Sequence, residues 1–190
     1  MIDTSILDAR LYRALVEIDQ ELCTKTQARG CPHCGGKLHS AQYPRKPRGW
    51  PAGVAEIGGE TRLSYCCAVC RRRTTPASVR FLGRRIYSAA VMVMGSMSPG
   101  RLSAKAARPL CEALKVPKRT LDRWRQWWRQ GFVKTSQWVL GQARFMPPLE
   151  PQELPSGFIE RFQGSDFTAR LVRCLRFLTT TGESLGGHLR

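Results

Sequence analysis

The hydrophobic positions in the first part of the chain recur at helical spacing. From residue 4 to residue 23 apolar side chains return every three or four positions, which predicts one helix with a single apolar stripe. Asp3, Thr4 or Ser5 is the expected cap at its start. We expect the stripe to pack against the rest of the protein, with a dimer seam as the alternative. The stripe consists of Leu7, Leu11, Ala14, Leu15, Ile18 and Leu22.

The second half of the chain has further apolar patterns, which proline and glycine interrupt. Residues 81–97 form an apolar run that predicts a buried helix, ended by Ser98-Pro99-Gly100. The next helix begins at Ser103 or at Arg108-Pro109, because proline is favoured in a first helical turn. We then expect a turn at Lys115-Val116-Pro117, a second helix to Gln130, a segment over 132–145, a proline-rich link over 146–155, and short helices at about 156–162 and 166–178.

The segment between residues 30 and 76 does not follow a helical pattern. From residue 41 to residue 53 prolines and glycines exclude regular structure, so we expect a loop at the tip of a hairpin. Residues 61–65 then alternate like a short strand that leads out of the loop. The predicted fold class is mainly α with a small β ribbon.

Two Cys-x-x-Cys pairs, separated by 32 residues, flank this hairpin. Each pair places two thiolates on one tight turn, near the roughly 2.3 Å Zn–S distance that a tetrahedral zinc site requires. Two such turns close a four-thiolate site, so we expect one structural Zn²⁺ whose binding holds a small module together. The predicted ligands are Cys31, Cys34, Cys67 and Cys70.

The sequence leaves some assignments of the site open. Cys66 stands beside Cys67 and could replace it as a ligand, and His39 is a possible substitute, whereas His33 should point away. A redox Cys-x-x-Cys would need one pair on a helix N-terminus in a βαβ unit. A catalytic zinc would need an open coordination position and a general base. Three further cysteines fall on the apolar sides of predicted helices, where we expect packing roles: Cys23, Cys111 and Cys174.

The chain is strongly basic. Its 31 lysines and arginines against 14 acidic residues give a formal net charge of +17, and residues 71–130 alone carry 15 basic and 2 acidic side chains. Positive charge concentrated in this way favours a polyanion such as nucleic acid as the partner, with a solvated basic surface as the alternative. Candidate phosphate contacts in the non-helical region are Arg45, Lys46 and Arg48, near Trp50, and Arg71, Arg72 and Arg73.

Residues 110–128 have the spacing of a helix-turn-helix, in which a short first helix braces a second one for the major groove. The apolar side of the second helix carries Leu121, Trp124, Trp127 and Trp128, of which we expect Trp124 and Trp128 to be buried. Arginine and glutamine can read base edges, and lysine can neutralise phosphate. An ordinary amphipathic helix pair is the alternative. The polar side carries Asp122 and the predicted DNA contacts Lys118, Arg119, Arg123, Gln126 and Arg129.

Together these motifs resemble the N-terminal DNA-binding portion of bacterial insertion-sequence transposases and of their small companion proteins. The resemblance covers about residues 31–130 and rests on Cys-Pro-x-Cys-Gly-Gly, on a second cysteine pair followed by Arg-Arg-Arg-Thr-Thr-Pro, and on Leu-x-Val-Pro-x-Arg-Thr-Leu-x-Arg-Trp. It implies binding to transposon-end DNA through a zinc ribbon and through the helix that carries Arg119 and Arg123.

The sequence departs from a full transposase of that type, which cuts DNA with three carboxylates on an RNase H-like fold that holds two divalent metals. Only 59 residues follow Gly131, and their acidic residues lack a strand context, so we expect no nuclease activity and no enzyme. The expected parts are an N-terminal helix (1–29), a four-cysteine zinc ribbon (30–76), a helix-turn-helix domain (77–132) and a C-terminal helical extension (133–190).

The expected partner is double-stranded DNA, bound in the cytoplasm at the nucleoid. No apolar run approaches the ~20 residues of a membrane span, and the N-terminus lacks the pattern of a signal peptide. One alternative is an RNA-binding module whose tryptophans stack on bases. Others are an adaptor that binds a companion transposition protein, and a self-dimer.

Overall fold

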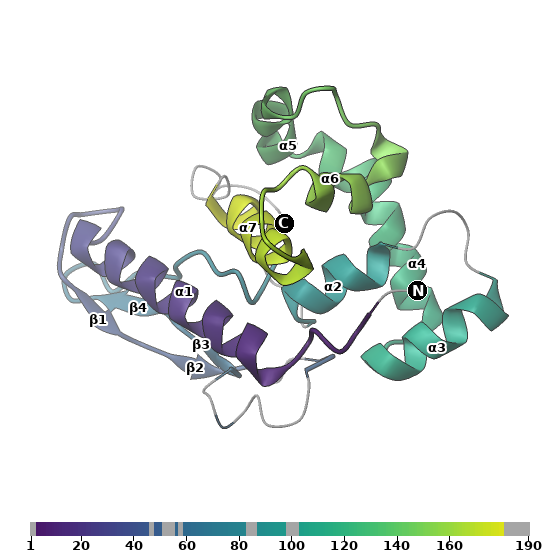
Figure 1. Cartoon of the computed structure of the whole chain (residues 1–190). Helices are drawn as coiled ribbons and strands as arrows, with labels where there is room; N and C mark the ends of the chain where they lie inside the picture. The colour runs from purple at the N-terminus through teal and green to yellow at the C-terminus, as the bar shows by residue number, and fades with distance from the viewer. Residues whose placement is uncertain are drawn as a thin grey trace.

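The computed structural model describes residues 3–45, 48–50, 56, 59–82, 87–97 and 103–180. A long first helix, α1 (Ala9–Arg29), lies alongside a small antiparallel sheet, and a group of helices stands at its N-terminal end (Figure 1). The protein is therefore mainly helical with a small β part, as the sequence predicts.

The first helix starts and ends later than its hydrophobic pattern predicts. It begins at Ala9, not at residue 4, because the Asp8 side chain accepts a hydrogen bond from the N–H of Leu11 at 2.9 Å and caps the helix. It runs past residue 23 to Arg29, and ends at Gly30, whose φ of 76° suits a residue without a side chain.

The prediction of a cap at residues 3–5 is therefore wrong. The predicted apolar stripe of α1 is buried in its central part. Leu11, Leu15 and Ile18 are buried, while Leu7 and Leu22 are half-buried against the same core. Tyr12 and Asp19 are also buried on this helix, and neither belonged to the predicted stripe.

The sheet consists of very short strands. β1 (Leu38–Ser40), β4 (Tyr65–Cys67) and β5 (Arg73–Thr74) pair antiparallel in the order β1-β4-β5. β2 (Tyr43–Pro44) and β3 (Thr61–Arg62) continue the hairpin as a second antiparallel pair. Across β1 and β4, Leu38 lies opposite Cys67 and His39 lies opposite Cys66.

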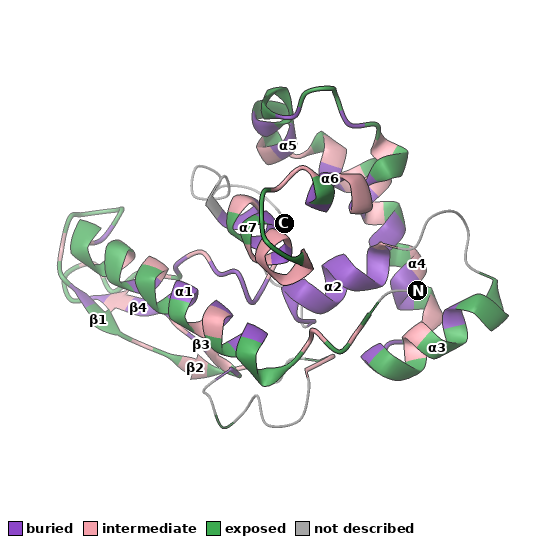
Figure 2. Ribbon diagram, viewed as in Figure 1, coloured by how far each residue is buried: buried purple, intermediate pink, exposed green. Residues whose placement is uncertain are grey.

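In the apolar run from residue 81, the described residues form a helix in the second half. Helix α2 (Ala89–Ser96) begins eight residues later than predicted, and all of its residues are buried (Figure 2). The chain before it is held in other contacts: the Ser78 hydroxyl accepts hydrogen bonds from the N–H groups of Arg80 and Phe81, at 3.2 and 3.3 Å. Tyr87 forms a β-bridge with Arg48. The predicted end at Ser98-Pro99-Gly100 lies outside the described residues.

Two helices, α3 (Ala104–Leu114) and α4 (Lys118–Gln126), occupy the segment where the sequence predicts a helix pair. Ser103 is the cap of α3, since its hydroxyl accepts a hydrogen bond from the N–H of Ala106 at 3.2 Å. After α4 the chain continues through a π-helical turn, Trp127–Gly131, and a 3₁₀ turn, Phe132–Lys134.

Helices α2, α3 and α4 share one hydrophobic core. A Cβ atom on Gly95 of α2 would lie 2.9 Å from Cδ2 of Leu121, so the missing side chain allows α2 to approach α4 closely. Trp124 and Trp128 are 5% and 0% exposed, which confirms their predicted burial. The shared core contains Tyr87, Val91, Met92, Leu114, Val116, Leu121 and Trp124.

The C-terminal segments cover the other side of α2. The two short helices predicted near the end are present as α6 (Ser156–Glu160) and α7 (Phe167–Thr180). Before them lie α5 (Ser136–Gly141) and two 3₁₀ turns, Gln142–Arg144 and Pro151–Glu153. An aromatic cluster joins these segments to the end of α4: Trp128, Phe132, Trp138, Phe145, Phe158, Phe162 and Phe177. Within the described part of the chain, no helix combines the length and apolarity that crossing a bilayer requires.

Candidate functional site

The four cysteines predicted as ligands lie together. Their Sγ atoms are all within 4.8 Å of one another. The Sγ atoms of Cys31 and Cys70 are 3.6 Å apart, and those of Cys34 and Cys67 are 3.5 Å apart. Sulfurs at roughly 2.3 Å from one zinc would stand about 3.8 Å from each other at the corners of a tetrahedron. The cluster is therefore a possible metal site, and its donors and spacing fit zinc.

The two cysteine pairs sit on turns of the same shape. In each turn the N–H of the first cysteine donates to the carbonyl oxygen five residues later, at 2.9 Å after Cys31 and 3.0 Å after Cys67. The residue before that carbonyl has a positive φ, 70° at Gly35 and 59° at Arg71. Glycine adopts this conformation freely, whereas a residue with a side chain is strained by about 1–3 kcal/mol. Arg71 is thus an arginine in a glycine position.

Strand geometry selects Cys67, and not Cys66, for the cluster. Neighbouring side chains on a strand point to opposite faces. The Cys66 thiol accordingly lies 3.5 Å from the carbonyl oxygen of Arg71, away from the other sulfurs. His39 pairs with Cys66 across the sheet, and Nδ1 of His33 lies 3.3 Å from Nη1 of Arg72, so neither histidine joins the cluster.

The thiols of the cluster influence one another's ionisation. The backbone N–H of Cys70 lowers the pKa of Cys67 to about 6, and the N–H of Val69 acts in the same direction. At Cys70 the N–H of Arg72 favours the thiolate, but burial and the three neighbouring thiols together raise its pKa to about 12. One thiol therefore loses its proton readily, and its negative charge disfavours ionisation of the next thiol. A bound dication would supply the opposite charge that stabilises all four thiolates.

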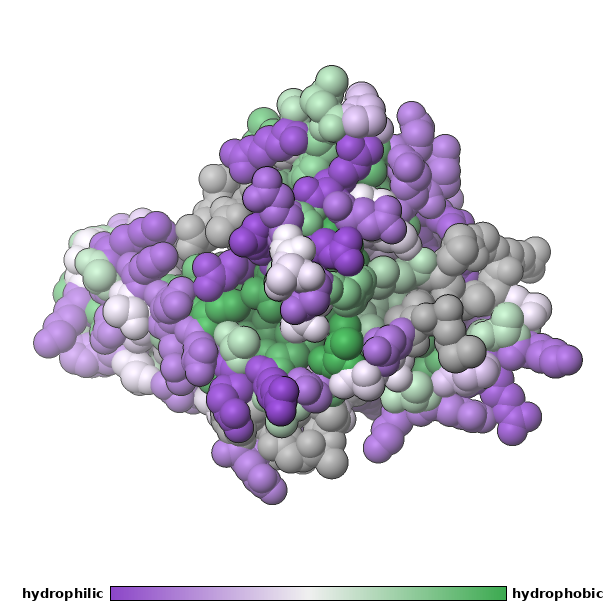
Figure 3. Space-filling view, in the orientation of Figure 1, coloured by the Kyte–Doolittle hydropathy of each residue, from purple (hydrophilic) through white to green (hydrophobic). Residues whose placement is uncertain are grey.

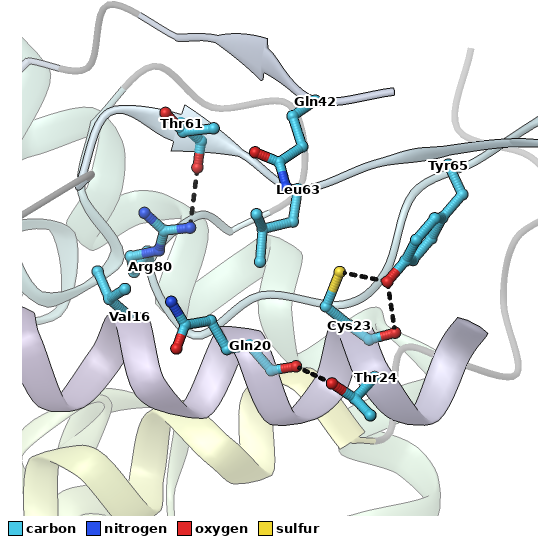
Figure 4. Close-up of a pocket in the computed structure, with 9 residues that line it drawn as sticks. All are labelled: Val16, Gln20, Cys23, Thr24, Gln42, Thr61, Leu63, Tyr65 and Arg80. Atoms are coloured by element: carbon cyan, nitrogen blue, oxygen red, sulfur yellow. Dashed lines mark hydrogen bonds between the residues drawn. The ribbon is translucent and has the colours of Figure 1, made fainter. Parts of the chain in front are cut away.

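The sheet meets α1 around a polar cavity of about 320 Å³ (Figure 4). At one end the Tyr65 hydroxyl donates to the carbonyl oxygen of Cys23 at 3.0 Å and accepts from the Cys23 thiol at 2.9 Å. At the other end Nη2 of Arg80 donates to the carbonyl oxygen of Thr61 at 2.9 Å. Cys23 is buried, as predicted, and it also anchors the cysteine-bearing strand β4 on α1.

A buried ion pair fixes the middle of α1 to the chain that leaves the sheet. Asp19 and Arg80 are each 1% exposed, and Nε of Arg80 donates to Oδ2 of Asp19 at 2.7 Å. The other carboxylate oxygen accepts from the N–H of Val79 at 2.7 Å, and Nη1 of Arg80 donates to the carbonyl oxygen of Gly59 at 2.8 Å. Sequence reasoning missed this pair, although Asp19 stands four residues after Leu15 on the apolar side of α1.

The first group of predicted nucleic-acid contacts lies beside the cysteines. Arg71, Arg72 and Arg73, which we call the knuckle arginines, are all exposed. Arg73 also stacks over the ring of Tyr43, with 5.4 Å between its Cζ and the ring centroid. Their exposure is compatible with the predicted phosphate contacts.

The predicted phosphate contacts in the loop that follows β1 differ in their exposure. Arg48 is exposed, but Arg45 is half-buried, with its Cζ 5.1 Å from the centroid of the Phe81 ring. Lys46 lies outside the described residues. Trp50 is half-buried between the rings of Tyr12 and Phe81, at centroid distances of 4.7 and 5.6 Å.

The second group lies on α4. Arg119, Arg123 and Gln126 are exposed on the side away from the core, and we call them the α4 face. Lys118 and Arg129 are half-buried, and Nζ of Lys118 forms an ion pair with Oδ2 of Asp122 at 2.6 Å. The two groups do not come together, because the knuckle arginines follow the cysteine turns at the C-terminal end of α1, whereas α4 lies beyond its N-terminal end (Figure 1).

No protein family, no curated protein and no solved structure matches this chain. The functional argument therefore starts from its own residues.

Proposed function

We propose that the protein is a zinc-stabilised double-stranded DNA-binding protein, transposase-like or mobile-element-associated, without a nuclease of its own. In this proposal the four cysteines hold one Zn²⁺ in a ribbon, and α3 and α4 act as a helix-turn-helix. The protein then works on DNA at the nucleoid.

The observation that carries the proposal is the two-sided character of α4. Its inner side is fixed in the core by Leu121 and Trp124, so the helix has a defined orientation. Its outer side presents Arg119, Arg123 and Gln126 to solvent. Arginine and glutamine are side chains that hydrogen-bond to guanine and adenine in the major groove, and an α-helix fits that groove.

The cysteine cluster supports a structural role for zinc. Four thiolates complete a tetrahedral shell and leave no position for a substrate or a water. The cluster residues Cys31, Cys34, Cys67 and Cys70 would hold the ion, and its binding free energy would stabilise the turns that carry the knuckle arginines. The ion supplies charge neutralisation for the thiolates, and the chain supplies the contacts to DNA.

Selection of bound sequences from a random duplex pool tests the proposal. We expect a motif to be enriched by the zinc-loaded protein, and the enrichment to weaken when a chelator removes the metal. Competition by single strands and structured RNA at fixed, near-physiological salt completes the test, because basic proteins bind every nucleic acid at low salt. Failure to enrich a motif, or preference for RNA, contradicts the proposal.

RNA stacking is the less favoured alternative because the tryptophans that it needs are already engaged. Trp50 packs against Tyr12 and Phe81, and Trp127 packs against Trp128 and Phe132. Bases stack on rings whose faces are open.

A further inference from the structure

The two groups of exposed basic residues are held apart by one helix. α1 has 21 residues and is therefore about 30 Å long. The knuckle arginines follow Cys70, whose Sγ is 3.6 Å from that of Cys31 just after the C-terminal end of α1, whereas α4 lies beyond the N-terminal end of α1 (Figure 1). Hydrophilic side chains project from both of these ends of the molecule (Figure 3).

Contacts along the whole length of α1 fix this separation. At the C-terminal end Nε2 of Gln27 donates to the carbonyl oxygen of Leu38 at 3.3 Å, and Cys31 follows directly after the helix. At the other end the Tyr12 hydroxyl lies 2.8 Å from the Ser88 hydroxyl. Leu7 packs against the core that α4 shares with α2.

The centre of α1 is fixed as well. The buried pair of Asp19 and Arg80 ties the helix to the chain between the sheet and α2. The two basic groups are thus parts of one packed body, and contacts at the two ends of α1 hold one group near each end of the helix.

This separation matches the repeat of a DNA duplex. One turn of B-DNA is about 34–36 Å, or about 10 base pairs. Contacts held at the two ends of a helix about 30 Å long therefore reach places on the duplex that are about one turn or more from each other.

The backbone at Arg71 gives an independent reason to assign a role to the knuckle arginines. Its φ of 59° is a conformation that glycine adopts freely, and the matching position of the first turn is Gly35. Strained residues of this kind are concentrated at functional sites. Arg71 is exposed, so its side chain is open to a partner outside the protein.

We propose that one molecule contacts duplex DNA at two separate places, with the knuckle arginines on one stretch of phosphates and the α4 face in a groove about one turn or more away. This inference rests on the proposed function. It adds that the target is bipartite, with sequence read mainly at the α4 end and the phosphate backbone held at the other end.

Hydroxyl-radical footprinting on a duplex enriched from the pool tests this proposal. The wild-type protein should protect two stretches whose centres lie about 10 base pairs or more apart. A variant with Arg71→Gly, Arg72→Ala and Arg73→Ala should lose one stretch and keep the other. Glycine at position 71 preserves the turn, and unchanged zinc content of the purified variant shows that the cluster is intact.

Salt dependence gives a second, quantitative measurement. Each phosphate contact contributes about 0.9 to the slope of log K against log salt concentration, so losing three contacts should reduce the slope by about 3. A charge-matched control carries Lys134→Ala, Arg144→Ala and Arg173→Ala, three exposed residues on the C-terminal segments. It should keep both protected stretches.

The outcomes separate the two proposals. A single protected stretch shorter than one turn, or an unchanged footprint of the knuckle variant, overturns the bipartite contact and leaves DNA binding in place. Equal losses for the knuckle variant and the charge-matched control also overturn it. Absence of duplex binding by the wild-type protein overturns the proposed function itself.

Discussion

Cys66 and Cys67 are adjacent in the sequence, yet their thiols lie on opposite faces of β4. The thiol of Cys67 is 3.5 Å from that of Cys34, whereas the thiol of Cys66 contacts the backbone at Arg71. The chain thus contains a matched pair of cysteines in which only one belongs to the cluster.

Cys67→Ser should remove most of the metal affinity, because the fourth thiolate is lost and the remaining sulfurs no longer close the shell. Cys66→Ser is the control and should bind zinc like the wild-type protein. Zinc content after dialysis, together with the thermal unfolding midpoint, measures both effects. Equal metal loss in the two variants would contradict the assignment of Cys67.

Arg123→Ala should weaken binding to the selected duplex by about 1–3 kcal/mol and relax the preference at one base pair. The side chain is exposed, and its Nη2 lies 3.4 Å from the Thr120 hydroxyl, so its removal leaves the α4 core intact. Affinities for the selected duplex and for random duplex are the measurement, with Arg173→Ala as a control. Equal losses on both duplexes would argue against base reading.

Tyr12 gives a pH dependence of stability. Burial raises the pKa of its hydroxyl above the ordinary value of 10.0. The folded state therefore keeps a proton that the unfolded chain loses, so stability is unaffected below about pH 10 and falls above it by up to about 1.4 kcal/mol per pH unit. Urea unfolding from pH 8 to 11 should show this decline, and Tyr12→Phe should reduce it. A parallel decline in the variant would exclude Tyr12 as the cause.

At the scale of secondary structure, the buried ion pair of Asp19 and Arg80 stabilises the packing of α1. Asp19→Asn leaves the guanidinium of Arg80 buried without its counter-charge, which should lower the free energy of unfolding by about 3–5 kcal/mol. Glu17→Gln removes an exposed acid from the same helix and serves as the control. Chemical denaturation measures both. A cost below about 1 kcal/mol for Asp19→Asn would show that Arg80 finds other partners.

The helices were predictable where periodicity alone decides them. The stripe of α1 and the pair α3 and α4 follow from apolar spacing and from the break at Lys115–Pro117, whereas the sequence left the start of α3 open between Ser103 and Arg108-Pro109. The start of α2 was not predictable, because residues before Ala89 satisfy a helical pattern. Hydrogen bonds from the N–H groups of Arg80 and Phe81 to the Ser78 hydroxyl hold the beginning of that run in another conformation.

In the candidate site, too, some features were predictable from the sequence and others were not. Cys-x-x-Cys spacing is local, so it identified the four clustered cysteines. The choice between Cys66 and Cys67 depends on the register of β1 against β4, and the ion pair of Asp19 with Arg80 joins residues 61 positions apart. Long-range pairings of this kind leave no repeating signal in a single sequence.

For the whole molecule, two regions should differ in their dependence on metal. One is the cysteine module, which is the four clustered cysteines with β1, β4 and β5, and the other is the helical core around α2 and the C-terminal helices. The described core of the module has five buried residues, Cys23, Cys31, Leu38, Tyr65 and Cys67, of which two belong to the cluster. The helical core is much larger and contains no member of the cluster. A metal bound by the cluster would therefore matter most for the cysteine module.

Chelation of zinc should unfold the module and leave the helical core folded. Amide protons of β1 and β4 should exchange rapidly after a chelator is added, while those of α2 and α4 stay protected. Hydrogen exchange followed by mass spectrometry or NMR resolves the two regions. Simultaneous loss of protection at both ends would show instead that the chain unfolds as one unit.

α1 contributes side chains to the cores at both of its ends: Leu11 and Leu15 to the helical core, and Cys23 to the cysteine module. Moving residues 30–76 alone into another protein would omit Cys23, whose thiol and carbonyl oxygen hydrogen-bond to the Tyr65 hydroxyl. The module therefore depends on its helix, and a graft intended to keep the module folded must include residues from Asp8 onward.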